Sequence, residues 1–140
     1  MNALSRDDLL SFLNMMLEAE RAGAKALLHI ARDTQRGDVA ILAKDIQKDE
    51  ARWCAMLTRA IRNLGGDPSA KTGQFYEKVI AISEDTARLD LVNRGQDWVV
   101  RKLSEMLPNI TDPQLAGDLT EMLSSHKDNI ARVAGSDLFH

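Results

Sequence analysis

Two residues whose side chains bind metals interrupt apolar runs that repeat with helical spacing. Glu20 lies four residues after Met16, and His126 lies four residues after Met122. On a helix, residues four apart share a face, so both side chains continue an apolar stripe. A carboxylate and an imidazole are ligands for Fe, Mn or Zn. Buried together without a metal, the same groups form a hydrogen-bonded network.

A second carboxylate and an amide interrupt two further apolar runs. Glu50 lies three residues before Trp53, and its neighbour Asp49 is close enough in angle to face the core instead. Asn93 and Gln96, three residues apart, occupy the equivalent place in the remaining run. Because an unpaired buried carboxylate costs several kcal/mol, we expect these groups to be satisfied by one another, by water or by a metal ion.

The residues that carry these side chains are predicted to be helical. Apolar residues recur with a period near 3.6, and no strand-like alternation competes with this pattern. Ser5 is typical of a helix N-cap, and Pro113 suits the first position of a helix. The sequence therefore predicts an all-α fold with a short helix at 74–82 and four main helices at about 5–34, 38–64, 84–107 and 112–134.

The lengths of the connections predict the topology. The first and last loops are short, so each joins an antiparallel pair of helices. The middle connection, residues 65–83, can span roughly 40 Å, which suffices to make the second and third main helices parallel. A simple up-and-down bundle with a folded-back excursion is the alternative. With helix midpoints near residues 20, 51, 96 and 123, the polar interruptions are expected to meet in one core layer, around which lie Asp49, Trp53, Asn93, Arg94 and Gln96.

This pattern resembles the ferritin-like superfamily. Its di-iron and di-manganese proteins use one Glu on each of two helices and a Glu-x-x-His motif on each of the other two. Glu20 corresponds to the lone glutamate of the first helix, Glu50 begins the first motif, and His126 ends the second. Trp53 stands in place of the first motif's histidine, and Leu123 stands in place of the second motif's glutamate.

The resemblance implies a degenerate di-iron site in a ferritin-like four-helix bundle with a long crossover, containing a short extra helix, between the second and third helices. Asn93 or Gln96 replaces the remaining glutamate, so three of the six usual ligands are present. Segments 17–23, 73–78 and 93–98 are also similar to a group of uncharacterised bacterial ferritin-like proteins. Too few carboxylates remain to bridge and balance two metal ions.

Two hypotheses for the function follow. In the favoured hypothesis the core is metal-free, and the glutamates are neutralised by Arg94, Arg52 or a protonated His126. The protein is then a non-enzymatic structural or interaction module. In the alternative, Glu20, Glu50 and His126 bind a single Fe, Mn or Zn ion, and the protein is a metal-dependent oxidoreductase with redox or oxygen-related activity.

Composition limits the class of protein and its partners. The 140 residues fit one domain spanning 1–140, and a net charge of −3 argues against a nucleic-acid surface or a polybasic membrane anchor. No apolar run approaches the ~20 residues needed to cross a bilayer, and the first residues lack a signal-peptide pattern. We therefore expect a cytoplasmic homodimer whose other partner, if any, is a protein.

Two small residues add to this interpretation. The single cysteine, Cys54, excludes an intrachain disulfide and is expected to be a small buried hydrophobe, not a nucleophile. Gly95 lies inside a predicted helix, where glycine costs up to ~1 kcal/mol relative to alanine. We therefore expect either a close approach of another helix at Gly95 or a small pocket beside Gln96.

Overall fold

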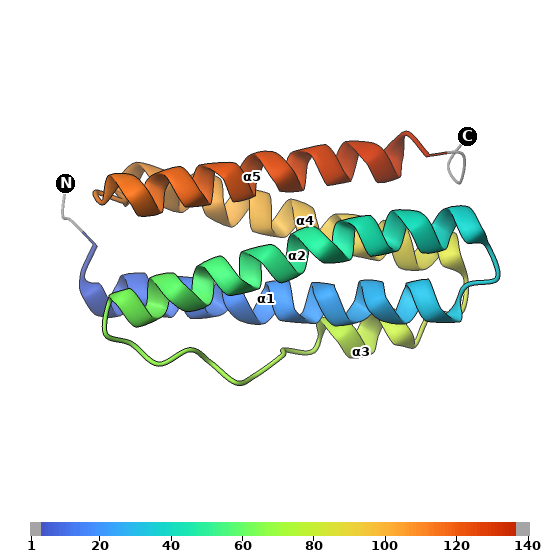
Figure 1. Ribbon diagram of the computed structural model, residues 1–140, viewed down its shortest axis with the longest axis horizontal. Helices are drawn as coiled ribbons and strands as arrows, with labels where there is room; N and C mark the ends of the chain where they lie inside the picture. Colours follow the sequence, from blue (N-terminus) through green and yellow to red (C-terminus); the bar gives the residue numbers. More distant parts are fainter. Residues whose placement is uncertain (1–3, 137–140) are drawn as a thin grey trace.

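The computed structural model describes residues 4–136, in which four long helices lie side by side (Figure 1). No strand occurs among these residues, which confirms the predicted all-α class. The predicted helix bounds are correct to within two residues, whereas the ends of the predicted domain, 1–3 and 137–140, lie outside the described part. The elements in chain order are α1 Arg6–Asp33, α2 Gly37–Asn63, α3 Phe75–Ile80, α4 Asp85–Met106, a 3₁₀ turn Leu107–Asn109 and α5 Pro113–Ala134.

Side-chain caps begin two of the long helices where the sequence predicts them. Ser5 Oγ accepts a hydrogen bond of 3.0 Å from the Asp8 N–H at the start of α1. The Asp112 carboxylate accepts one of 2.8 Å from the Leu115 N–H at the start of α5, where Pro113 is the first helical residue. Each cap satisfies a backbone donor that has no partner within its own helix.

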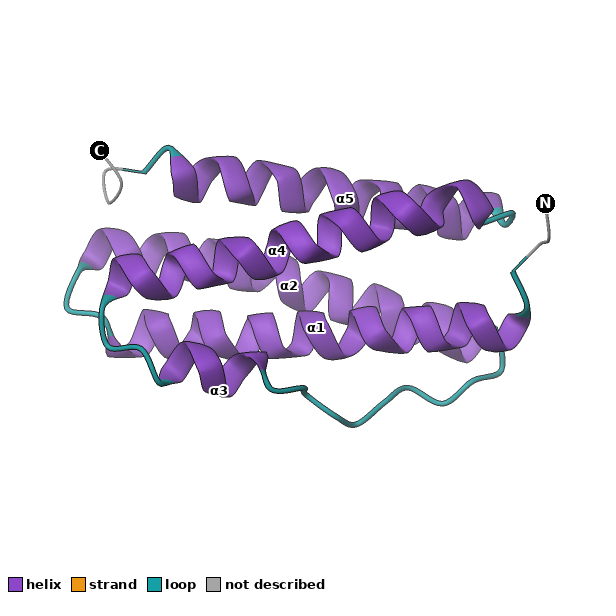
Figure 2. Ribbon diagram, turned by 180° about the vertical axis from the view of Figure 1, so that it is seen from behind, coloured by secondary structure: helices purple, strands orange, loops and turns teal. Residues whose placement is uncertain are grey.

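The connection between α2 and α4 runs along the length of the molecule. In Figure 1 the chain goes out along α1 and back along α2, and then crosses the full length before α4 begins. The view from behind shows the same crossover, with α3 near its end (Figure 2). Helices α2 and α4 therefore run in the same direction, and α5 returns antiparallel to α4. This is the arrangement that the length of residues 65–83 predicts.

The short helix α3 packs against α1 and α4. A Cβ atom built on Gly95 of α4 would lie 2.8 Å from Cζ of Phe75, the first residue of α3. Real Cβ atoms do not approach other atoms so closely, so glycine is needed here for the Phe75 ring to pack onto α4. The expected close approach at Gly95 is thus present.

A polar layer divides the apolar core into two clusters. Along every long helix, the buried apolar residues of the two clusters flank a buried polar residue near the helix midpoint, and α5 adds a second one, Asn129, one turn further on. The four residues at the midpoints are Glu20, Glu50, Gln96 and His126. The cluster on one side includes Leu13, Leu57, Leu103 and Leu119, and the cluster on the other includes Leu27, Ile46, Leu89 and Val133.

The surface of α4 carries pairs of opposite charge one turn apart. Arg94 lies 3.0 Å from the Asp90 carboxylate, and Arg101 lies 3.3 Å from that of Asp97. Such exposed pairs contribute little to stability and mark a solvated face. Within residues 4–136, none of the helices is long and apolar enough to cross a membrane.

Candidate metal site

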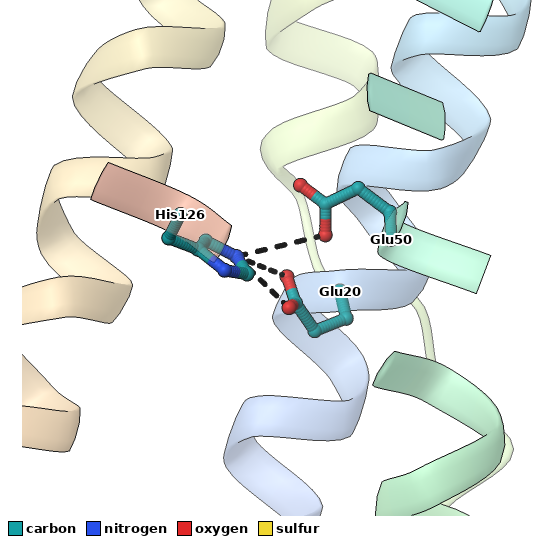
Figure 3. Close-up of side chains that lie close together, drawn as sticks. All are labelled: Glu20, Glu50 and His126. Carbon is teal, nitrogen blue, oxygen red and sulfur yellow. Dashed lines mark hydrogen bonds and ion pairs between the residues drawn. The ribbon is translucent and has the colours of Figure 1, made fainter. Parts of the chain in front are cut away.

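Helices α1, α2 and α5 bring the buried side chains of Glu20, Glu50 and His126 together (Figure 3). Nε2 of His126 lies 2.9 Å from Oε1 and 3.1 Å from Oε2 of Glu20, and 3.8 Å from Oε2 of Glu50. One ligand atom from each of the three residues lies within 4.8 Å of the other two. All three side chains are at least 97% buried. The predicted convergence of two carboxyl groups and an imidazole is therefore correct.

The His126 ring is oriented by its own helix. Its Nδ1 lies 2.9 Å from the Met122 carbonyl oxygen, one turn earlier in α5. A carbonyl oxygen only accepts hydrogen bonds, so Nδ1 carries the proton of this bond. Nε2 is thereby directed at the carboxyl groups of Glu20 and Glu50. Histidines that bind a metal through Nε2 commonly donate their Nδ1–H group to a backbone carbonyl in this way.

Burial perturbs both carboxyl groups in the same direction. Burial raises the pKa of Glu20 to about 7, although a hydrogen bond with Glu50 acts against this shift. The pKa of Glu50 is raised well above its ordinary value by burial first and by the negative charge of Glu20 second, with His126 opposing. Two carboxyl groups hydrogen-bond to each other only when one of them carries a proton. The pair therefore needs either a proton or a cation near neutral pH.

The prediction that Arg94 or Arg52 neutralises the glutamates is wrong. Arg94 is exposed and pairs with Asp90, so it does not belong to the polar core layer. It lies two residues from the buried Gln96, which places the two side chains about 200° apart around α4. Arg52 is exposed as well: it lies 4.5 Å from the centre of the Trp53 ring and 3.2 Å from the Glu121 carboxylate.

The structure decides between the adjacent carboxylates of α2. Glu50 is buried, whereas Asp49 is half-buried and accepts a hydrogen bond of 3.0 Å from the amide of Asn129 on α5. The prediction that Asp49 lies in the polar core layer is therefore only partly correct, because it borders the layer and does not face His126. Trp53, also predicted there, is 2% exposed and donates its indole N–H to Ser125 Oγ at 3.2 Å.

The two amides of α4 have different surroundings. Asn93 is half-buried and donates a hydrogen bond of 3.1 Å to the Ile130 carbonyl oxygen, which ties α4 to α5. Gln96 is 3% exposed, and neither its amide nitrogen nor its amide oxygen has a hydrogen-bond partner among the residues described. Gln96 lines the same pocket as Glu20 and Glu50. Of the two predicted amides, Gln96 is thus the one that joins the candidate site.

Sequence reasoning missed the contribution of Gly23. A Cβ atom at this position of α1 would lie 3.1 Å from Oε1 and 3.2 Å from Cδ of Glu50. The absence of a side chain on Gly23 therefore makes room for the Glu50 carboxyl group. The signal was present, because Gly23 follows Glu20 by three residues and so lies on the same face of α1.

The distances are suitable for a single metal ion. For metal–ligand bonds of about 2.1 Å, adjacent donor atoms lie roughly 3.0 Å apart in octahedral and 3.4 Å apart in tetrahedral geometry. The separations of 2.9 Å and 3.8 Å from Nε2 to the two carboxyl groups bracket this range. Three protein ligands leave at least one coordination position for another ligand, as in catalytic zinc sites. The carboxyl groups of Glu20 and Glu50 line a pocket from which such a ligand can enter.

Comparison with known families finds one match. A family model described as "Domain of unknown function (DUF6306)" matches residues 7–135, a range that includes all four residues of the polar layer. Neither the curated proteins nor the solved structures include a significant match to this sequence. Arguments about function therefore depend on the site itself.

Proposed function

Since the chain belongs to the DUF6306 family, defined by a domain of unknown function, we propose a function from the site: the protein binds one Fe, Mn or Zn ion between Glu20, Glu50 and His126. The observation that carries this proposal is the meeting of two buried carboxyl groups and one oriented imidazole within 4.8 Å. A divalent ion bound by two carboxylates and a neutral imidazole gives a centre with no net charge. It thereby offsets the cost of burying both carboxylates, which is several kcal/mol per ion when unpaired.

We further propose that the fold is ferritin-like with a reduced metal site. Three features support this: the two antiparallel pairs of helices, the long crossover that makes α2 and α4 parallel, and the polar layer at the middle of every long helix. In this proposal Glu20, Glu50 and His126 keep ligand roles. Trp53 and Leu123 occupy positions where a two-metal site needs further ligands.

Each residue of the site has a separate task in this proposal. Glu20 and Glu50 supply negative charge and oxygen ligands, and Gly23 allows the Glu50 carboxyl group to reach its position. The Met122 carbonyl fixes the ring of His126 so that Nε2 points at the carboxyl groups. The surrounding apolar clusters keep bulk water away from the ligands. A redox-active ion such as Fe or Mn, when bound, supplies electron transfer or oxygen-related chemistry in this buried position.

The raised pKa values of the two glutamates favour a second candidate. Protons shared by the carboxyl groups and His126 satisfy the layer without a metal, since burial raises the pKa of Glu20 to about 7 and that of Glu50 well above its ordinary value. The protein is then a metal-free structural or interaction module. The two candidates differ in whether purified protein carries a metal.

Elemental analysis distinguishes them. The protein is expressed with added Fe, Mn and Zn, and purified without a chelator or a histidine tag. We expect close to one metal ion per chain, and loss of that ion in Glu20→Gln/Glu50→Gln, which keeps the volume of both side chains. Glu77→Gln/Glu105→Gln, with both changes at exposed positions, is the matched control and is expected to retain the metal. The proposal would be overturned if the folded wild-type protein contains no metal after purification and binds none of the three ions when each is added.

A further inference from the structure

A pocket of about 490 Å³ lies between α1 and α4, and residues 72–75 of the crossover form part of its wall. The pocket extends from the surface to the polar layer, where Glu20, Glu50 and Gln96 line it. Its volume is in the range of small-molecule binding sites. The other lining side chains are mainly apolar and include Phe75, Leu91, Val92, Trp98 and Val99.

Gln96 contributes to this pocket a buried amide whose nitrogen and oxygen both lack a partner within residues 4–136. Its amide is 3% exposed and makes no hydrogen bond with any residue in the range 4–136. A buried amide without partners is costly, because it has lost its hydrogen bonds to water. Within the described part of the chain, one carboxyl oxygen each of Glu20 and Glu50 also lacks a hydrogen-bond partner, whereas Gln96 lacks one at both its nitrogen and its oxygen. The Gln96 amide thus offers its N–H donors and its carbonyl acceptor to a molecule in the pocket.

We propose that this pocket binds a neutral small molecule with an apolar body and a carboxamide or lactam group, which pairs with the amide of Gln96. A carboxamide presents an N–H donor and a carbonyl acceptor side by side, which matches the acceptor and donor of Gln96. The apolar lining accommodates the rest of the molecule.

Other polar groups fit the pocket less well. A carboxylate would be repelled by the carboxyl groups of Glu20 and Glu50, and the nearby Arg94 and Arg101 already pair with Asp90 and Asp97. An ammonium group would be attracted by the carboxyl groups of Glu20 and Glu50, but it cannot accept a hydrogen bond and so would leave the Gln96 N–H groups unpaired. A neutral amide avoids both problems.

This inference goes beyond metal binding and does not depend on it. The apolar walls and the Gln96 amide belong to the protein alone, so a ligand can bind in chelator-treated protein. If the metal is present as well, the polar end of the ligand lies beside the metal centre, because Gln96, Glu20 and Glu50 line one pocket.

Octanamide is a suitable probe. Its binding to chelator-treated protein is measured by calorimetry and by the change in tryptophan fluorescence, to which Trp98 in the pocket wall contributes. We expect saturable binding of one molecule per chain, with octanoate and octylamine of the same chain length bound at least about tenfold more weakly. No saturable binding of octanamide, or a preference for octylamine or octanoate, would overturn the inference.

Two variants and a control test the part played by Gln96. Gln96→Leu preserves most of the side-chain volume and is expected to weaken octanamide binding at least about tenfold. Gln114→Leu, at an exposed position of α5, is the matched control and is expected to bind octanamide as the wild type does. Ala19→Trp, on the partly exposed wall of the pocket, is expected to abolish binding by filling it.

The results separate this inference from the metal proposal. Equal octanamide affinity in the wild type and in folded Gln96→Leu or Ala19→Trp protein would show that the probe binds elsewhere, which overturns the inference. The metal content of purified protein is a separate measurement. A metal-free protein that binds octanamide through Gln96 would contradict only the metal proposal, and a metal-containing protein that does not bind octanamide would contradict only the pocket.

Discussion

The stability of the metal-free protein is expected to fall as the pH rises from 5 to 8. Glu20 has an ordinary pKa of 4.5, and burial raises its pKa in the folded protein to about 7. The folded state therefore binds the Glu20 proton more tightly than the unfolded state does. The resulting stabilisation is fully present below pH 4.5 and is lost as the pH rises through 7. Glu50 acts in the same direction, because its pKa is also raised.

The size of the effect follows from the two pKa values of Glu20. At 1.36 kcal/mol per pKa unit, Glu20 alone lowers the free energy of unfolding by about 2–3 kcal/mol between pH 5 and pH 8. This is a large share of the roughly 5–15 kcal/mol by which domains are stable. Urea denaturation followed by circular dichroism, with a chelator present, measures the change at each pH.

Glu20→Gln tests whether Glu20 is responsible. A glutamine at this position has the shape of glutamate, and its N–H group can donate to Nε2 of His126, which points at it. We expect this variant to show a much smaller pH dependence and to be about 2–3 kcal/mol more stable than the wild type at pH 8. Glu105→Gln, at an exposed position of α4, is the control and is expected to follow the wild type.

A flat stability profile of the wild type between pH 5 and pH 8 would refute this reasoning. Adding Fe(II), Mn(II) or Zn(II) gives a second test, in which the expected pH dependence has the opposite sign. Metal binding displaces protons from carboxyl ligands, so the stabilisation by metal is expected to increase with pH. If no metal changes the stability at any pH while the profile of the metal-free protein falls as expected, the protonated core is correct and the metal proposal is wrong.

Three further predictions concern small residues. Gly23→Ala is expected to lower metal affinity at least about tenfold in a competition titration, because the added Cβ would lie 3.1 Å from a Glu50 carboxyl oxygen. Unchanged affinity would show that the carboxyl group has room to move. The Cys54 thiol is expected to resist iodoacetamide in the native protein and to react on unfolding. Burial raises its pKa to about 12, so that about one molecule in ten thousand is a thiolate at pH 8. Rapid labelling of the native protein would contradict this. Gly95→Ala is expected to lower the Tm through a clash with Phe75, and Phe75→Leu to cost less in that background than in the wild type; additive effects in this double-mutant cycle would contradict the contact.

Local signals explain why the helices could be predicted from the sequence. The caps at Ser5 and Asp112 depend on residues within one turn, and the structure contains both hydrogen bonds. The meeting of Glu20 with His126 was also predictable, because both lie at the midpoints of helices of similar length. Their contact joins residues that are 106 positions apart in the chain.

Other features depend on packing that a single sequence does not reveal. Asp49 and Glu50 differ by about 100° around α2, so an error of one residue in helix phase exchanges them. Arg94 was expected to reach the core, but it shares α4 with the buried Gln96 and lies on another face. The spacing of Gly23 from Glu20 places it on the core face of α1, but which residue of α2 it faces depends on how the two helices pack.

The polar layer and the pocket that reaches it together separate the two apolar clusters of the core. The apolar clusters on either side show that these helices bury leucine, isoleucine and valine efficiently. A layer of well-packed apolar residues in place of Glu20, Glu50, Gln96 and His126 would therefore be at least as stable, since buried charges and unpaired amides lower stability. Packing alone does not explain why the layer is polar, nor why a pocket leads to it. The proposed binding of an ion by the carboxyl groups and of an amide by Gln96 would explain both, because each ligand would contribute free energy that the protein alone lacks.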